Sequence, residues 1–417
     1  MNLLKKAYCR SFQTAFKIAL PFLPYRTPRI LNKIDELPYL LFSMNIKSVL
    51  LVTDAQIRKN GLTSTLEKLL AEDGIKCTVY DKTQPNPTVA NVEEARLLYV
   101  NAKCEGIIAF GGGSSMDCAK GVGIRIARPN KTLSQLKGIL KVRKKLPFLA
   151  AIPTTAGTGS EVTLTAVITD SKTHYKYTIN DFPLIPQAAV LDPAVTYTLP
   201  PNLTATTGMD ALTHAIEAYI GRTTTRQTRH WAKLAVKMIF HNIEDAYHNG
   251  GNEFARRNML IASNLAGAAF SQSYVGYVHA VAHSLGGAYN IPHGLANSVL
   301  LPYVLEAYGK SAWKKIKKLA VAARKAYRDD TPEVATRKFI TEIRAMNRNM
   351  GIPETLSGIK VKDIPNLAER ADKEANPLYP VPKLMDAEEL QQFYYKVMSK
   401  EEFDEQSGNS PAGRETA

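Results

Sequence analysis

Hydrophobic positions in the first half of the chain come in short runs that alternate with segments of helical period. The apolar runs at 48–54, 76–80 and 106–110 are typical of buried strands. Between them, the segments 61–71 and 88–102 place their apolar residues at helical spacing. This alternation predicts a parallel β-sheet whose two faces are covered by helices.

The pattern changes near Pro200. Beyond it, strand signals stop and long segments rich in Ala and Leu dominate, as at 229–246, 253–270 and 311–327. Such segments predict helices that pack against one another. The second half of the chain is therefore expected to be all-α.

Two loops rich in glycine and hydroxyl residues follow predicted strands. The segment 111–117 (GGGSSMD) follows the strand at 106–110 and opens a helix, and the segment 153–160 (PTTAGTGS) follows an apolar run at 148–152. Glycines let a backbone approach a pyrophosphate, and a free helix N-terminus favours an anion. The glycine spacing differs from the GxGxxG of an ordinary Rossmann domain. Three glycines alone are compatible with a mere tight turn, but the second loop favours a dinucleotide site. Its candidate residues are Gly111, Gly112, Gly113, Ser114, Ser115, Asp117, Thr154, Thr155, Thr158 and Ser160.

Asp54 stands at the carboxyl end of the predicted strand at 48–54. A carboxylate in this position accepts hydrogen bonds from ribose hydroxyls and repels a 2′-phosphate, which favours NAD(H) over NADP(H). From the spacing alone, a capping or turn aspartate is an equally good interpretation.

Four side chains in 208–293 are candidate metal ligands: Asp210, His214, His279 and His293. Asp210 and His214 are four residues apart and project from one face of a predicted helix. One carboxylate and three imidazoles suit Fe(II) or Zn(II). Any one of them alone would be an ordinary capping or surface residue. His283 forms a further four-residue spacing with His279, and three of the 8 histidines fall between 279 and 293, which favours a site.

Four segments resemble the iron-dependent (group III) alcohol dehydrogenase family, in its order and spacing. The resemblance runs from about Pro28 to about Ser399 and implies hydride transfer between NAD(H) and an alcohol or aldehyde. It also implies that the four candidate ligands bind the metal, Fe(II) by the family and Zn(II) as the alternative, and that His283 lies by the nicotinamide and substrate without binding metal. The matching segments are GGGSSMD, IPTTAGTGSEVT, GMDALTHAIEAYI and YVHAVAHSLGGAYNIPHGLANSVLLPYV.

The resemblance also adds to the cofactor site. The segment 85–88 matches a family loop near the cofactor, which places Asn86 there, and Lys176 matches a lysine near the ribose. It makes the cofactor role of Asp54 the better interpretation. One departure is Tyr274, where the family usually has a small residue, so a narrower pocket or an added hydroxyl is expected.

Together these patterns predict an α/β N-terminal dinucleotide-binding domain with a parallel sheet, plus an all-α C-terminal metal-binding domain. We expect these domains at 28–199 and 200–399. Residues 1–27 form a basic amphipathic extension, and the polar tail at 400–417 is expected to be disordered.

The extension carries Lys5, Lys6, Arg10, Lys17 and Arg26 and no acidic residue up to position 26. Large apolar residues are mixed among these charges. Three alternatives are open: a helix packed on the enzyme, an arm docking on a partner, or an anchor at a membrane surface.

The composition and charge limit the classes of protein and partner to be expected. A charged content of 22% and a hydrophobic content of 45% are ordinary for a globular protein. The net charge of +15 comes partly from 310–328, a predicted surface helix without a nucleic-acid motif, so no nucleic-acid partner is expected. The four cysteines lack CxxC spacing, which indicates reduced thiols in a cytoplasmic protein. A homodimer or larger assembly is expected.

Two other functions compete with an alcohol dehydrogenase or aldehyde reductase. A lyase similar to the dehydroquinate synthases would use NAD transiently, but it needs basic side chains to grip a phosphate, whereas the metal segments here are apolar. A non-catalytic docking member of the fold would not need the intact ligand set. The alcohol or aldehyde itself does not follow from the sequence.

Overall fold

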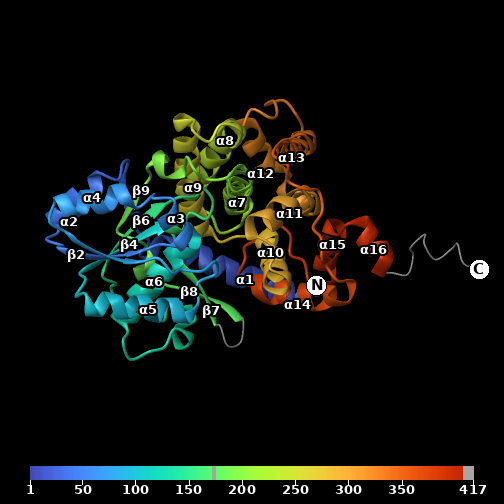
Figure 1. Cartoon of the computed structure of the whole chain (residues 1–417). Coiled ribbons are helices and arrows are strands. Elements are labelled where there is room, and N and C mark those ends of the chain that lie inside the picture. The colour runs from blue at the N-terminus through green and yellow to red at the C-terminus, as the bar shows by residue number, and fades with distance from the viewer. Residues whose placement is uncertain (171–174, 407–417) are drawn as a thin grey trace, which may run out of the picture. The chain divides into compact units, whose positions relative to one another are not determined.

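The computed structural model describes residues 1–170 and 175–406, and its described residues form two compact units (Figure 1). We call the first the α/β unit; it comprises 24–199 and 249–271. The second, the helical unit, comprises 1–23, 200–248 and the chain from 272 onward.

A six-stranded, fully parallel sheet forms the centre of the α/β unit. The prediction of a parallel sheet is confirmed, and all three strands expected between 48 and 110 are present. The strands, in their order across the sheet, are β1 (Arg29–Leu31), β9 (Ala188–Val190), β6 (Phe148–Pro153), β4 (Gly106–Gly111), β2 (Ser48–Val52) and β3 (Lys76–Tyr80).

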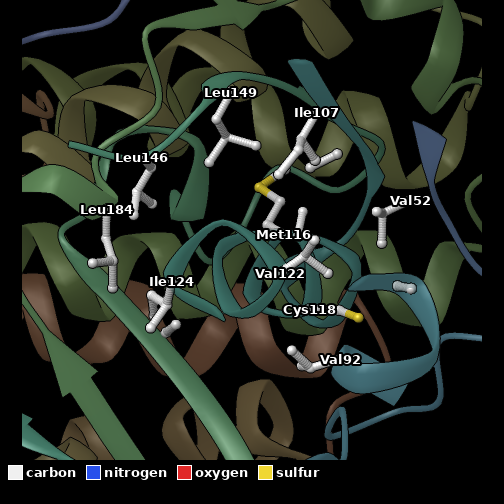
Figure 2. Packing of buried hydrophobic residues seen from close by; sticks show 14 of the residues in the cluster. Val52, Val92, Ile107, Met116, Cys118, Val122, Ile124, Leu146, Leu149 and Leu184 are labelled. Atoms are coloured by element: carbon white, nitrogen blue, oxygen red, sulfur yellow. The ribbon is translucent and has the colours of Figure 1, made fainter. Parts of the chain in front are cut away.

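Helices cover both faces of this sheet, because successive residues of a strand point to opposite sides. Leu50 and Val52 of β2 belong to a core shared with α5 (Val89–Asn101) and α6 (Gly113–Ala127). Figure 2 shows side chains of α6 packed in this core. The alternate residues of β2 face the opposite core, which contains residues of α2 (Glu36–Ser43), α3 (Ala55–Lys59) and α4 (Ser64–Glu72).

A second, three-stranded sheet in the α/β unit was not predicted. Its order is β5 (Gly138–Ile139), β8 (Tyr175–Asn180) and β7 (Thr165–Asp170), with β7 and β8 antiparallel. β7 and β8 are six residues long but partly polar, and they do not show the apolar runs that marked the main sheet. The unit also contains the 3₁₀ turns η2 (Ser134–Leu136), η3 (Ser160–Val162), η4 (Phe182–Leu184) and η5 (Pro193–Thr196).

The helical unit contains no strand among its described residues; one isolated bridge joins Leu356 and Met398. The prediction of an all-α second half is confirmed. None of the helices described is long and apolar enough to span a membrane. The helices are α1 (Leu3–Ala19), α7 (Pro201–Ile220), α8 (Arg226–His248), α10 (Tyr277–Tyr289), α11 (His293–Tyr308), α12 (Lys310–Ala322), α13 (Pro332–Asn349), α14 (Ile364–Ala375), α15 (Ala387–Val397) and α16 (Lys400–Gln406), with η1 (Leu20–Phe22) and η6 (Val361–Asp363).

Helix α9 (Glu253–Ser273) follows residue 200, where the second domain was expected to begin. Nevertheless, residues 249–271, which contain most of this helix, belong to the α/β unit. The reason is a close backbone approach. A Cβ atom on Gly159 would lie 2.7 Å from the Cα atom of Gly267 in this helix. Two glycines therefore let the loop at 159 and α9 touch directly.

Most of the N-terminal extension forms α1, which packs on the rest of the helical unit. Cys9 and Gln13 are buried on its inner face. The Arg10 guanidinium donates to the carbonyls of Val381 (2.8 Å) and Pro382 (2.9 Å). Of the three alternatives for this extension, packing on the rest of the chain is the one observed.

The expected disorder of the tail does not hold for 400–406, which form α16. The Ser399 hydroxyl accepts a hydrogen bond from the N–H of Glu402 at 3.2 Å, which caps the helix. Glu402 in turn accepts from the N–H of Gly358 at 3.0 Å. Residues 407–417 lie outside the described residues.

Candidate metal centre and cofactor loops

Three helices of the helical unit bring the four predicted metal ligands together. Asp210 and His214 lie one turn apart on α7, His279 lies on α10, and His293 is the first residue of α11. One ligand atom from each lies within 4.8 Å of the other three. Asp210 Oδ1 is 3.7 Å from Nε2 of His279 and 3.5 Å from Nε2 of His293. Within the helical unit, α11 packs against both α7 and α10 (Figure 1).

The charges in this cluster suit a cation. Burial favours a neutral carboxyl, but His214, His293 and His279 outweigh it and hold the pKa of Asp210 below its usual range. Burial lowers the pKa of His293 to about 3, although Asp210 opposes this shift. An ionised carboxylate and a neutral imidazole are the forms that bind metals.

His279 has a buried nitrogen that fits a metal. Its Nε2 makes no hydrogen bond within the described residues. Asn297 Nδ2 donates to Asp210 Oδ1 at 2.7 Å and lies 3.1 Å from Nε2 of His293. A buried nitrogen without a partner normally costs stability. Beside a carboxylate and two further imidazoles, it fits a divalent transition metal.

Glu217, which contacts this cluster, is a residue that the sequence analysis missed. Its Oε2 lies 2.7 Å from Nδ1 of His279 and accepts from the N–H of Gly276 at 2.7 Å, and its Oε1 accepts from the N–H of Val278 at 2.9 Å. A carboxylate on Nδ1 leaves Nε2 to face the metal. Burial alone would lower the pKa of His279, but Asp210 and Glu217 raise it to about 9.

The spacing of Glu217 was a usable signal. It lies three residues after His214 and seven after Asp210, so all three project from one face of α7. Gly276 has the complementary role: a Cβ atom there would lie 2.6 Å from Glu217 Oε1. The glycine therefore makes room for the carboxylate.

His283 lies beside the four-residue cluster and is not a member of it. Its ring stacks on that of His293, with centroids 5.1 Å apart and planes 18° apart. Its Nδ1 is 2.6 Å from Glu374 Oε1. The side chain is 41% exposed, so solvent can reach it.

In the α/β unit, the two glycine-rich loops lie side by side. Gly111 has φ +152°, which favours glycine, and its carbonyl accepts from the N–H of Thr154 at 3.0 Å. A Cβ atom on Gly113 would lie 3.0 Å from the methyl group of Thr158. Helix α6 begins at Gly113, so its first N–H groups emerge between the loops.

The loop at 85–88 also reaches this place. The N–H of Asn86 donates to the Ser114 hydroxyl at 3.2 Å, and Asn86 is in the left-handed region with φ 59°. The structure therefore brings together the three segments from which dinucleotide-binding residues were predicted.

Lys120 is a second residue that the sequence analysis missed. It is fully buried, and its ammonium group donates to the Ser160 hydroxyl (3.1 Å) and to the carbonyl of Thr165 (2.8 Å). Ser160 donates in turn to Asp117 Oδ1 at 3.3 Å. Burial lowers the pKa of Lys120 and raises that of Asp117. Asp117 and Ser160 thus support the loops from within, and Ser115 is also enclosed at 1% exposure.

Asp54 caps a helix in this structure. Its Oδ1 accepts from the N–H groups of Gln56 and Ile57, both at 2.9 Å, at the start of α3. This is the alternative that the spacing left open. Lys176 lies on β8, where burial lowers its pKa.

Comparison with known proteins decides the family. The model of the iron-containing alcohol dehydrogenases matches residues 30–193, and that of the C-terminal part of the Fe-containing alcohol dehydrogenase family matches 204–398. The chain belongs to the iron-containing alcohol dehydrogenase family. It is 38% identical over 365 residues to 1,3-propanediol dehydrogenase of Klebsiella pneumoniae, covering 87% of this chain and 93% of that relative. It is 37% identical over 344 residues to alcohol dehydrogenase 4 of Saccharomyces cerevisiae strain YJM789, covering 82% and 89%.

A solved structure agrees with this assignment to the iron-containing alcohol dehydrogenases. Alcohol dehydrogenase from Oenococcus oeni superposes with a TM-score of 0.85 at 32% identity, over 89% of this chain and all of that one (100%). The likeness extends over both the α/β part and the helical part of the chain.

Tyr274 stands at a position where the family was expected to have a small residue. Its backbone conformation is also unusual. It follows the end of α9 with φ 60°, a region where glycine is preferred. Its ring meets Phe16 of α1 edge-on at 5.2 Å and lies 6.4 Å from the ring of Tyr379. The departure therefore connects the N-terminal helix with the segment around 379.

Proposed function

We propose that this protein is an NAD(H)-linked alcohol dehydrogenase or aldehyde reductase with its metal held by Asp210, His214, His279 and His293. The observation that carries the proposal is the convergence of these four ligand atoms to within 4.8 Å, in a chain of this family. One carboxylate and three imidazoles accept Fe(II), which the family favours, or Zn(II), which such donors bind more tightly. When bound, the metal would act as a Lewis acid toward the oxygen of an alcohol or aldehyde.

The surrounding residues prepare these ligands. Glu217 holds Nδ1 of His279 at 2.7 Å and so directs Nε2 toward Asp210. Asn297 holds Asp210 Oδ1 at 2.7 Å. His283, next to His293 and partly exposed, moves a proton to or from the substrate oxygen or orients the nicotinamide.

The dinucleotide is assigned to the α/β unit. The N–H groups that open α6 would hold the pyrophosphate, together with the loops at 111–117 and 153–160. Asn86 and Lys176 would contact the cofactor from the flanking segments. Asp54 favours NAD(H), because its charge would repel a 2′-phosphate.

The lyase alternative is not favoured. Around the metal ligands the side chains are apolar and buried, as at Ala211, Ala280 and Leu285, and a phosphate-bearing substrate would need basic groups there. A non-catalytic role has no use for the oriented His279 and its Glu217 partner.

The proposal is tested with His279→Ala and His293→Ala, purified anaerobically. Both variants should lose bound metal and the oxidation of NADH by a panel of short aldehydes. NADH binding, followed by fluorescence, should survive, because the loops assigned to the dinucleotide belong to the other unit. His241→Ala, an exposed histidine on α8, is the matched control. Full metal content in both ligand variants would contradict the metal assignment. A wild-type protein that oxidises NADH no faster with any of the aldehydes than without them would contradict the proposed activity.

A further inference from the structure

His283 is held by a partner that no sequence motif singles out. Its Nδ1 lies 2.6 Å from Oε1 of Glu374, on α14, and the two residues are 91 positions apart in the sequence. A ring nitrogen that donates to a carboxylate fixes which nitrogen carries the proton and how the ring is turned. With Nδ1 engaged, Nε2 is the nitrogen that remains for other partners.

Glu374 is itself held from a second side. The Tyr379 hydroxyl donates to the same Oε1 at 2.6 Å, and Tyr379 is buried. Burial alone would raise the pKa of Glu374, but His283 and Tyr379 hold it below its usual value. The carboxylate is thus an ionised acceptor fixed between two donors, which gives it one preferred orientation.

The N-terminal helix anchors Tyr379 in turn. Gln13 of α1 is buried, and its amide donates to the carbonyls of Tyr379 (2.8 Å) and Pro377 (3.2 Å). Aromatic rings make a second connection: the ring of Phe16 in α1 packs on that of Tyr274, and the ring of Tyr274 lies next to that of Tyr379. A Tyr at φ 60° is strained by about 1 kcal/mol, and strain of this kind is retained where the surroundings fix it.

We propose that Glu374 is a positioning residue for His283, and that helix α1 contributes to this positioning through Tyr379. The N-terminal extension is then an internal part of the catalytic unit. The expected effect on kcat rests on the proposed function, whereas the expected effect on the orientation and protonated nitrogen of the His283 ring does not.

The structural consequence is measured by NMR of full-length, zinc-loaded protein with ¹⁵N-labelled histidine, because zinc is diamagnetic. His283→Asn identifies the signals of His283. In the wild type we expect the proton on Nδ1. Glu374→Gln and Tyr379→Phe should move the ring toward a mixture of both tautomers. Glu369→Gln, an exposed acid on the same helix, should leave the signals unchanged. A His283 spectrum that is the same in wild type and Glu374→Gln would overturn the proposal.

The kinetic consequence separates positioning from a merely structural role. Glu374→Gln should lower kcat for aldehyde reduction about tenfold or more, the usual scale for a group that orients a functional histidine. KM for NADH and the bound zinc per chain should stay unchanged. Loss of zinc in Glu374→Gln would show that Glu374 supports the metal ligands, which overturns the assignment to His283. A wild type without dehydrogenase activity would refute the proposed function, and the NMR result would still decide the role of Glu374.

The contribution of α1 has its own pair of variants. Gln13→Ala removes the bonds to Pro377 and Tyr379, and it should shift the His283 signals in the same direction as Tyr379→Phe. Thr14→Ala is the control, since Thr14 is exposed and its hydroxyl donates to the Arg10 carbonyl of the same helix. An unchanged His283 spectrum in Gln13→Ala would remove α1 from the proposal.

Discussion

Glu217 Oε2 lies 2.7 Å from Nδ1 of His279, although 62 positions separate the two residues in the sequence. The same carboxylate accepts the N–H groups of Gly276 and Val278. It therefore fixes the start of α10 and the ring of His279 at once. If the four candidate ligands hold a metal as proposed, the site should depend on this contact as well.

Glu217→Gln should weaken metal binding about 10- to 100-fold. The amide can still accept one hydrogen bond, but it no longer carries the charge that favours the Nδ1 proton. Competition with a chelator, followed by metal analysis, measures the change. Glu306→Gln, an exposed glutamate of the same unit that pairs with Arg344, is the control. Equal affinity in both variants would show that Glu217 serves only the backbone of α10.

Asp54→Asn separates the two roles of Asp54. Asparagine caps a helix about as well as aspartate, so the melting temperature should not change. The charge is lost, so kcat/KM with NADPH relative to NADH should rise about tenfold or more. Asp73→Asn, at an exposed position in the same unit, should alter neither quantity. An unchanged cofactor ratio would leave Asp54 with its capping role alone.

Gly267→Ala should destabilise the α/β unit. In a helix interior this change normally stabilises by about 1 kcal/mol. Here the new Cβ atom would lie 2.7 Å from Val162 Cγ1 and 2.9 Å from the Cα atom of Gly159. Overpacking of this kind costs about 1–3 kcal/mol, so the melting temperature should fall by about 3 °C or more.

The control for this variant is Gly287→Ala on α10, where no described atom other than those of the adjoining residues and of the nearby backbone of the same helix lies within 4 Å of the new Cβ. It should leave the melting temperature equal or raise it. A Gly267→Ala protein that melts at or above the wild-type temperature would contradict the close approach of α9 and the loop at 159.

The thiols of the folded protein should react slowly with iodoacetamide. All four cysteines are free, and burial raises the pKa of Cys77 and of Cys118 to about 12. A raised pKa lowers the thiolate fraction at pH 8, and the thiolate is the reactive form. Relative to an unfolded cysteine with a pKa of about 8.5, both should react at least about a hundredfold more slowly. Mass spectrometry of labelled peptides, with the urea-unfolded protein as control, distinguishes the sites. Rapid labelling of Cys77 in the folded protein would contradict the raised pKa of its thiol.

Local sequence patterns were sufficient for the larger features of the fold. The apolar run at β2 predicts a strand because alternate residues, such as Leu50 and Leu51, must be buried on opposite faces. The change to helical spacing of apolar residues near Pro200 predicts the helical part, because residues three and four apart share the buried face of a helix. The strands β7 and β8 were missed because their partly polar sequences carry no comparable signal.

The four residues that converge in the candidate metal centre could also be named from the sequence, because the family motifs and the four-residue spacing of Asp210 and His214 are local. Disorder at 400–406 was expected from composition, yet Ser399 caps α16 and Glu402 reaches Gly358. Composition does not record such a contact across more than forty positions of the chain.

The sequence by itself determined the family, the alternation of strands and helices, and the identity of the groups that can bind a metal, because each depends on residues close together in the chain. Only the tertiary structure decided which side chains orient those groups. Glu217 meets His279, Glu374 meets His283, and Lys120 meets Thr165 through helices and loops brought together by packing. A hydrogen bond needs its two atoms within about 3 Å, and no local pattern specifies that distance between residues so far apart in the chain.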